Sequence, residues 1–249
     1  MCRSGLLVAW IAAWLDGRVS YDAAVAAITG PDAPHRVVGL PHSDSSRDDQ
    51  AVPLGWLLGE VRSRRCGSPR LVLPAPGDPR GLPVATEFTG AALDAGEAAV
   101  CGEYGLVPHV TGGHGDLVTW CVFAVPPARA DTLSPAEASH DLDDALRAVT
   151  AELVELDVPS WRTDLAGALS VARRPTGVNL PPGHDQRARA LLTRADQLTA
   201  VLRLADADTP GGAVTADEAQ RRTQALSPLR TAVRRARLAS YNAALAHAT

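Results

Sequence analysis

The chain contains no lysine, and all 24 of its basic residues are arginine. A guanidinium does not form a Schiff base and does not titrate near neutral pH, so lysine-dependent catalysis is excluded. The missing lysine, the single methionine and the frequent alanines together indicate a GC-rich bacterial coding sequence. Aromatic residues make up only 4% of the chain, so leucine, valine and alanine must fill its core.

Cysteines are few, and no long apolar run is present. The four cysteines are scattered and form no C-x-x-C pair. The apolar run 5–15 is too short for a bilayer, which needs about 20 residues, and no signal-peptide cleavage pattern follows it. No basic residues line the polar face of its helical stripe, which favours a buried core helix over a membrane-surface anchor. These features predict a cytoplasmic protein with free thiols and no membrane span.

The common catalytic and nucleotide-binding motifs are also missing. The chain has no G-x-S-x-G elbow, no Walker A loop, no G-x-G-x-x-G after a strand and no paired-histidine zinc motif. The sequence therefore predicts no cofactor and identifies no reaction.

The first half, residues 1–127, is predicted to be a mixed α/β region with a small antiparallel sheet. The Gly-rich segment 111–116 joins two strands as a hairpin loop. Pro108 predicts an edge strand or a bulge, because proline donates no ladder hydrogen bond. After the N-terminal helix we expect helices at 21–28, 53–64 and 87–94, and strands at 36–40, 70–74, 97–101, 105–110 and 117–125.

The second half, residues 131–249, is predicted to be a helical bundle. Ser134 and Glu137 form a capping box at the start of its first helix. Ser227-Pro228 is expected to interrupt or kink a later helix. The predicted fold class is thus α+β: N-terminal helices, a small, mostly antiparallel sheet, and a C-terminal helical bundle. The expected helices start near 135, 161, 184 and 216.

Cysteine and histidine gather around the predicted hairpin, with the spacing C-x7-H-x4-H-x6-C. Structural zinc sites bring their ligands in close pairs from a knuckle or a helix turn, and this spacing matches neither device. We therefore predict no metal and interpret the two thiols as buried strand residues. The four residues are Cys101, His109, His114 and Cys121.

Two loops carry polar groups that would suit a ligand. The Pro-rich loop 75–83 exposes Asp78 and Arg80, and the Gly-rich hairpin loop holds an acid–base pair. The simpler interpretations are a stiff turn with an internal Asp–Arg pair, and glycines that serve hairpin geometry. The hypothesis is an anionic-ligand site in a cleft between the two halves. Its candidate residues are Asp78, Arg80, His109, His114 and Asp116.

Charge is segregated along the chain. Residues 219–249 contain six arginines and no acid, whereas residues 131–164 contain nine acids and two arginines. Three interpretations are possible, and we rank them as follows: the two segments pair within one molecule, the basic segment binds an acidic protein partner, or it binds nucleic acid. The first is favoured and the last is the least favoured. The net charge of −4 opposes nonspecific binding to phosphates, and no aromatic platform accompanies the arginines.

Two functions follow as alternatives. The leading one is a cytoplasmic bacterial interaction or scaffold protein without catalytic activity, which binds a protein partner or assembles as a homo-oligomer. The other is a small-molecule binding protein or enzyme that uses the five candidate residues.

Overall fold

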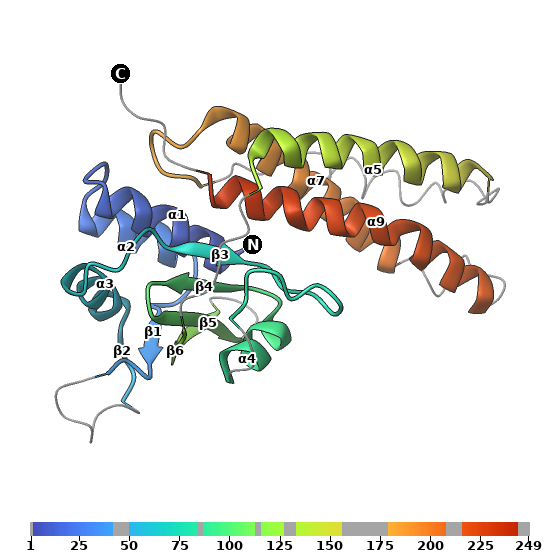
Figure 1. Ribbon diagram of the computed structural model, residues 1–249. Coiled ribbons are helices and arrows are strands. Elements are labelled where there is room, and N and C mark those ends of the chain that lie inside the picture. The colour runs from blue at the N-terminus through green and yellow to red at the C-terminus, as the bar shows by residue number, and fades with distance from the viewer. Residues whose placement is uncertain are drawn as a thin grey trace. The chain divides into compact units, whose positions relative to one another are not determined.

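The fold was described from a computed structural model, over residues 2–41, 50–83, 87–112, 116–126, 133–155, 179–207 and 216–243. The chain forms two compact units. The first holds the described residues up to 126 together with 179–184, and the second holds the described residues from 133 to 155 and from 185 to 243. The predicted α+β class is confirmed: N-terminal helices, a mostly antiparallel sheet and C-terminal helices follow one another (Figure 1).

The first unit begins with two helices that sequence patterns locate well. Helix α1 (Arg3–Leu15) is buried on almost every side, which confirms the core interpretation of its apolar stripe. Helix α2 (Tyr21–Thr29) starts where the Ser20 hydroxyl accepts a hydrogen bond from the main-chain N–H of Ala23. Helices α3 (Leu54–Ser63) and α4 (Glu87–Ala95) complete the helical part of this unit.

The sheet of the first unit has six described strands in the order β2-β1-β6-β5-β4-β3. All neighbours are antiparallel except β1 and β6, which run parallel. The strands β4, β5 and β6 are the three that alternation and turn signals predicted around the hairpin. The strand bounds are β1 Arg36–Val38, β2 Val52–Pro53, β3 Arg70–Val72, β4 Ala98–Cys101, β5 Tyr104–Thr111 and β6 Leu117–Ala124.

Pro108 does not mark an edge strand or a bulge, because β5 lies between β4 and β6 and its register with β6 is continuous. The physical reason is the short length of β4, which pairs with β5 only over Tyr104–Leu106. At Pro108 one side of β5 therefore has no strand partner, so the missing N–H breaks no ladder on that side.

Both faces of β4 are buried. Ala98 and Val100 join a core under α4, while Ala99 and Cys101 point to the opposite face, since successive side chains alternate. Helix α1 contacts β3, β4 and β5. Gly105 of β5 lies directly under α4, where an added Cβ would overlap the Phe88 ring.

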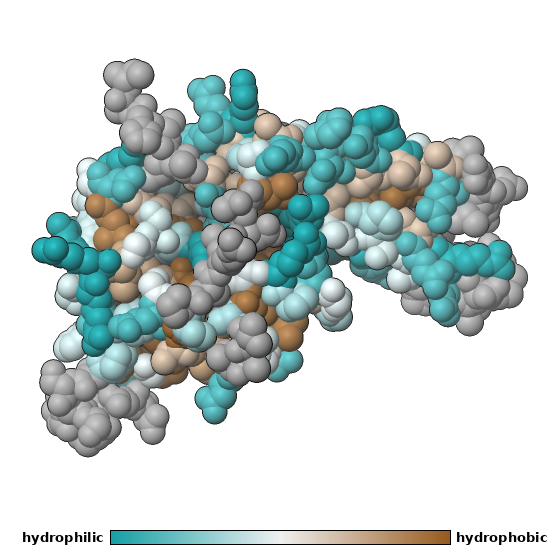
Figure 2. Space-filling view, viewed as in Figure 1, coloured by the Kyte–Doolittle hydropathy of each residue, from teal (hydrophilic) through white to brown (hydrophobic). Residues whose placement is uncertain are grey.

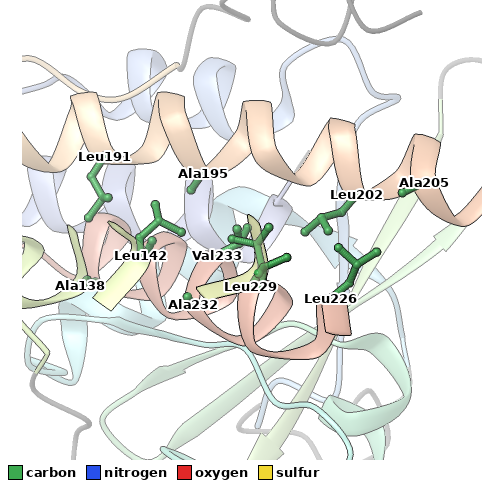
Figure 3. Packing of buried hydrophobic residues seen from close by; sticks show 13 residues of the cluster. Ala138, Leu142, Leu191, Ala195, Leu202, Ala205, Leu226, Leu229, Ala232 and Val233 are labelled. Carbon is green, nitrogen blue, oxygen red and sulfur yellow. The ribbon is translucent and has the colours of Figure 1, made fainter. Parts of the chain in front are cut away.

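In the second unit, α5 (Pro135–Glu155), α7 (Gln186–Ala207) and α9 (Ala216–Tyr241) pack around one shared core. Helix α9 contacts both of the others extensively. Leucine and valine side chains from the three helices point toward one another in this core, and small alanines let the backbones approach (Figure 3). Hydrophobic surface continues along the seam between α5 and α9, bordered by hydrophilic residues (Figure 2).

The helix starts in this unit confirm part of the sequence reading. The Ser134 hydroxyl accepts from the Glu137 N–H at 3.2 Å, and the Glu137 carboxylate accepts from the Ser134 N–H at 3.0 Å, which is the predicted capping box. Pro228 lies inside α9 without ending it, so the expected interruption is wrong, while the alternative, a kink at this residue, stays a prediction. The helix expected near residues 161–172 lies outside the described residues.

Candidate functional site

Four of the five residues proposed from sequence belong to the part of the chain that the structure describes, and the contacts described below lie in different networks. Arg80 donates to both carboxylate oxygens of Asp78, each at 2.6 Å, inside a turn closed by hydrogen bonds between Ala75 and Asp78. The structure therefore brings these two together as the internal pair that was the simpler interpretation. His109 lies exposed on β5, opposite Thr119. His114 is outside the described residues.

Asp116 has a different role from the one its loop suggested. Its carboxylate accepts a hydrogen bond from Arg3 Nη2 at 2.7 Å. The same guanidinium is held by the two oxygens of Asp32, with Nε–Oδ2 at 2.8 Å and Nη2–Oδ1 at 3.2 Å. One arginine thus ties the start of α1 to the α2–β1 connection and to the start of β6. The contact with Arg3 lowers the pKa of Asp32, which keeps that carboxylate charged.

His35 extends this network into the core. The Trp120 indole N–H donates to His35 Nδ1 at 3.2 Å, so the ring proton must sit on Nε2. Nε2 faces Asp32 Oδ2 at 3.5 Å, which is within ion-pair range but too long for a good hydrogen bond. Burial lowers the pKa of His35 despite this carboxylate, and the imidazole is neutral at pH 7. With its basic nitrogen occupied by an indole, His35 supports the fold and is not an available base.

Three arginines of the basic helix α9 pair with acids of their own unit. Arg235 Nη1 donates to Asp141 of α5 at 3.0 Å, so one arginine of residues 219–249 meets the acids of residues 131–164 as predicted. Two further arginines pair instead with acids of α7, which the charge count did not predict. These are Arg230 with Asp206 at 2.7 Å and Arg237 with Asp196 at 3.0 Å.

No metal site was found: the described parts of the chain contain no group of three or more His, Cys, Asp or Glu side chains placed to hold an ion. None of the described helices has the length and apolar character that crossing a bilayer demands.

A large groove in the first unit lies between α2 and α3. Its volume is about 960 Å³, which is at the upper end for ligand sites in proteins. Its lining is mostly apolar or small. The lining residues include Tyr21, Val25, Ala26 and Thr29 on the α2 side, Pro34 in the α2–β1 connection, Pro53 of β2, and Gly55, Trp56, Gly59, Glu60 and Ser63 on the α3 side.

Helix α3 has two contrasting faces, and one of them opens into this groove. Leu54, Leu57, Leu58 and Val61 are buried against the rest of the unit. Gly55, Gly59 and Ser63 recur every fourth residue and therefore form one small-residue row on the groove side. Trp56 is 59% exposed and Tyr21 is 43% exposed, so two large aromatic residues of the groove remain open to solvent.

The two glycines of this row differ in what they contact. An added Cβ at Gly55 would overlap the Tyr21 hydroxyl, so Gly55 is required for Tyr21 to cross toward α3. An added Cβ at Gly59 meets no atom within 4 Å. Glycine inside a helix costs about 1 kcal/mol relative to alanine, and no contact within the described residues compensates for that cost at Gly59.

The groove carries little charge. Its single acidic residue, Glu60, already accepts from Arg64 Nε at 2.6 Å and from the Tyr104 hydroxyl at 3.0 Å. Burial and the neighbouring Glu60 raise the pKa of Tyr104 to about 12, so this phenol stays neutral. The Ser63 hydroxyl donates to the main-chain carbonyl of Glu60. The arrangement can hold apolar groups but contains no activated nucleophile among these residues.

Sequence reasoning missed the groove, although a signal was present. Gly55 and Gly59 are four residues apart, and Trp56 falls on the polar side of a helix whose leucines face inward. An aromatic residue beside two glycines on the outward face of this helix is the signal that could have directed attention to the groove.

Comparison with known proteins gives a family but no activity. A family model described as "Rv1486c-like protein, N-terminal domain" matches residues 4–135, and its C-terminal counterpart matches residues 136–238. The chain is 29% identical over 284 aligned positions to "Uncharacterized protein Rv1486c" of Mycobacterium tuberculosis. It is 27% identical over 293 positions to "Uncharacterized protein ML1804" of Mycobacterium leprae. Each alignment covers 98% of this chain and 97% of the relative. No solved structure matches significantly.

Proposed function

Because the chain belongs to the Rv1486c-like family, whose names record no activity, we propose a function from the geometry: a non-catalytic interaction protein of the bacterial cytoplasm. Its first unit binds an apolar helix of a protein partner in the groove between α2 and α3. The observation that carries this proposal is the solvent-exposed Trp56 beside the open space at Gly59.

The shape of the groove favours a helix as its occupant. Small residues every fourth position on α3 let another helix backbone approach closely, and Val25 and Ala26 of α2 also line the groove. Amphipathic helices are commonly recognised in this way, through apolar anchors at positions i, i+3 or i+4, and i+7. Helix α3 has ten residues and is therefore about 15 Å long, enough to contact two to three turns of a partner.

The electrostatics favour an apolar contact. Glu60 is satisfied by Arg64 and Tyr104, and the remaining lining is uncharged apart from the buried, neutral His35. Association should therefore depend weakly on salt, in contrast to binding of a polyanion, whose affinity falls steeply as salt rises.

A displayed library of 16-residue amphipathic helical peptides tests the proposal. The full-length protein is the bait, and binders that also recognise a Gly59→Leu variant are removed. A Cβ at this position meets no atom within 4 Å, and the remainder of the leucine side chain is intended to occupy the groove. We expect the surviving peptides to carry apolar residues at i, i+3 or i+4, and i+7. Fluorescence anisotropy should show at least a tenfold weaker affinity for Gly59→Leu and Trp56→Ala.

The matched control is Leu93→Ala, which removes another exposed apolar side chain, on α4. It should leave the affinity unchanged. Peptides that bind Gly59→Leu as tightly as the original chain would refute the groove as the docking site. If Gly59→Leu instead abolishes self-association of the chain in sedimentation experiments, the occupant is a second copy and the partner-protein assignment is wrong.

A further inference from the structure

Two free cysteines that are far apart in the sequence meet at the end of α3. Cys66 lies in the segment that leaves this helix, and Cys101 is the last residue of β4. The Cys101 thiol donates to the carbonyl oxygen of Gly67 at 3.7 Å, and Gly67 directly follows Cys66 in the chain. Gly102 packs against Cys66 so closely that an added Cβ would be 3.3 Å from the Cys66 Sγ.

The backbone places Cys66 there at a conformational cost. Among the described residues, Arg65 is the only non-glycine residue with a positive φ, at 51°. The N–H of Cys66 donates to Val61 O at 3.1 Å and the N–H of Arg65 donates to Arg62 O at 3.2 Å, which is the Schellman pattern of a helix end. Glycine normally occupies this left-handed position because other residues are strained in it. The chain keeps an arginine there, and the turn directs Cys66 onto Cys101.

We propose that Cys66 and Cys101 form an oxidation site that closes to an intramolecular disulfide in the presence of a hydroperoxide. The Cys66 thiolate attacks the peroxide, its sulfur forms a bond to oxygen, and the O–O bond breaks to release water or an alcohol. The Cys101 thiol then attacks the sulfenic acid of Cys66, the S–O bond breaks and a second water leaves. Two thiols are oxidised and one hydroperoxide is reduced.

The order of the two steps follows from burial. Cys66 is partly exposed and can meet the oxidant, whereas the Cys101 side chain is fully buried and can reach only its neighbour. Closure requires a sulfur–sulfur bond of about 2.05 Å, and the two cysteines already adjoin each other through Gly67 and Gly102. Desolvation raises the pKa of both thiols, that of Cys101 to about 12, so little thiolate is present at pH 7. Oxidation should therefore be slow at pH 7 and accelerate about tenfold per pH unit below the pKa of Cys66.

Closure would join the end of α3 to the β4–β5 turn. The same two elements are already linked by Arg64, which pairs with Glu60 at 2.6 Å and with Glu103 at 3.1 Å and lies over the Tyr104 ring. A disulfide here would therefore reinforce an existing contact and would not require α3 to move away from the sheet.

The experiment uses the full chain with Cys2→Ser and Cys121→Ser, so that only the pair remains. The folded protein is treated with hydrogen peroxide, and free thiols and intact mass are followed. We expect both thiols to disappear together, the mass to fall by two hydrogen atoms, and a single peptide pair joining Cys66 and Cys101 in a non-reducing digest. Dithiothreitol should restore both thiols.

Single substitutions separate the two roles. Cys101→Ala should leave a sulfenic acid at Cys66 that dimedone traps, and Cys66→Ser should protect Cys101 from peroxide. The proposal is overturned if peroxide converts Cys66 to a sulfinic acid without any linked peptide. It is equally overturned if the linkage forms only after urea unfolds the chain, because native proximity would then have no part in it.

Discussion

The contrast between Gly55 and Gly59 gives the sharpest test of the groove. Both residues line the groove, but Gly59 lies in the interior of α3 and Gly55 is its second residue, so alanine improves helix propensity by about 1 kcal/mol at Gly59 and by no more than that at Gly55. A destabilising Gly55→Ala would therefore report what the added methyl group meets. At Gly59 it meets nothing within 4 Å, and we expect Gly59→Ala to raise the free energy of unfolding by about 0.5–1 kcal/mol.

At Gly55 the new methyl group would overlap the Tyr21 hydroxyl, and Tyr21 would have to swing away. That movement disrupts its edge-to-face contact with Trp14, whose ring centre is 6.1 Å away. Overpacking of this kind costs about 1–3 kcal/mol, so Gly55→Ala should be neutral or destabilising by up to about 2 kcal/mol. The two variants should therefore differ by about 1–3 kcal/mol.

Urea unfolding followed by circular dichroism measures this difference, with the transition of the first unit fitted separately from that of the second. A double variant with Tyr21→Ala provides the control, because Gly55→Ala should regain its propensity gain once the tyrosine is absent. Equal effects of the two single variants would refute the assigned geometry. A destabilising Gly59→Ala would mean that the space beside Gly59 is already occupied in the molecule.

Three further predictions concern the rest of the fold. Burial holds the pKa of His35 below its ordinary value of 6.5, so the folded state binds fewer protons than the unfolded state and stability should fall as pH drops through 6.5. Urea midpoints between pH 5 and 8 should lose this slope in His35→Gln, and an unchanged slope would refute the assignment. Leu142 is fully buried between the C-terminal helices, and Leu142→Ala should lower the free energy of unfolding of that unit by about 2–5 kcal/mol. The thermal midpoint reports this loss, and a loss below about 1 kcal/mol would refute the assigned packing. The Arg235–Asp141 pair is partly exposed, and a double-mutant cycle should give a coupling of about 0.2–1 kcal/mol that weakens in high salt; no coupling at low salt would contradict the pairing.

Local signals were read correctly wherever they were self-contained. Ser20 and Ser134 mark helix starts because the capping hydrogen bond depends only on residues within one turn. The β4–β5–β6 meander was predictable because short connections join antiparallel neighbours. The prediction for Pro108 was wrong because the number of strands that flank β5 at this residue depends on where β4 begins, and the sequence around Pro108 does not specify that.

The candidate site shows the opposite limit. Asp116 belonged to a suggestive loop, but its partner Arg3 lies 113 residues away, and no pattern near Asp116 indicates it. The arginines of α9 were predicted to meet acids of residues 131–164, and Arg235 does so. Arg230 instead pairs with Asp206 of α7, because α9 contacts both α5 and α7. The charge count along the sequence does not distinguish between these two neighbours.

Composition, periodicity and capping residues determined most of the described secondary elements, though not the two-residue strand β2, where a helix was expected to begin at residue 53. They also determined the α+β class and the lack of lysine chemistry, since each of these depends on residue type or on neighbours within a few positions. Tertiary packing alone decided the parallel pairing of β1 with β6, the approach of Cys66 to Cys101 and the open face of α3. These features depend on which distant segments come together when the core forms. Burial of apolar surface drives that step, and because it is non-directional, the local sequence does not specify which segments become neighbours.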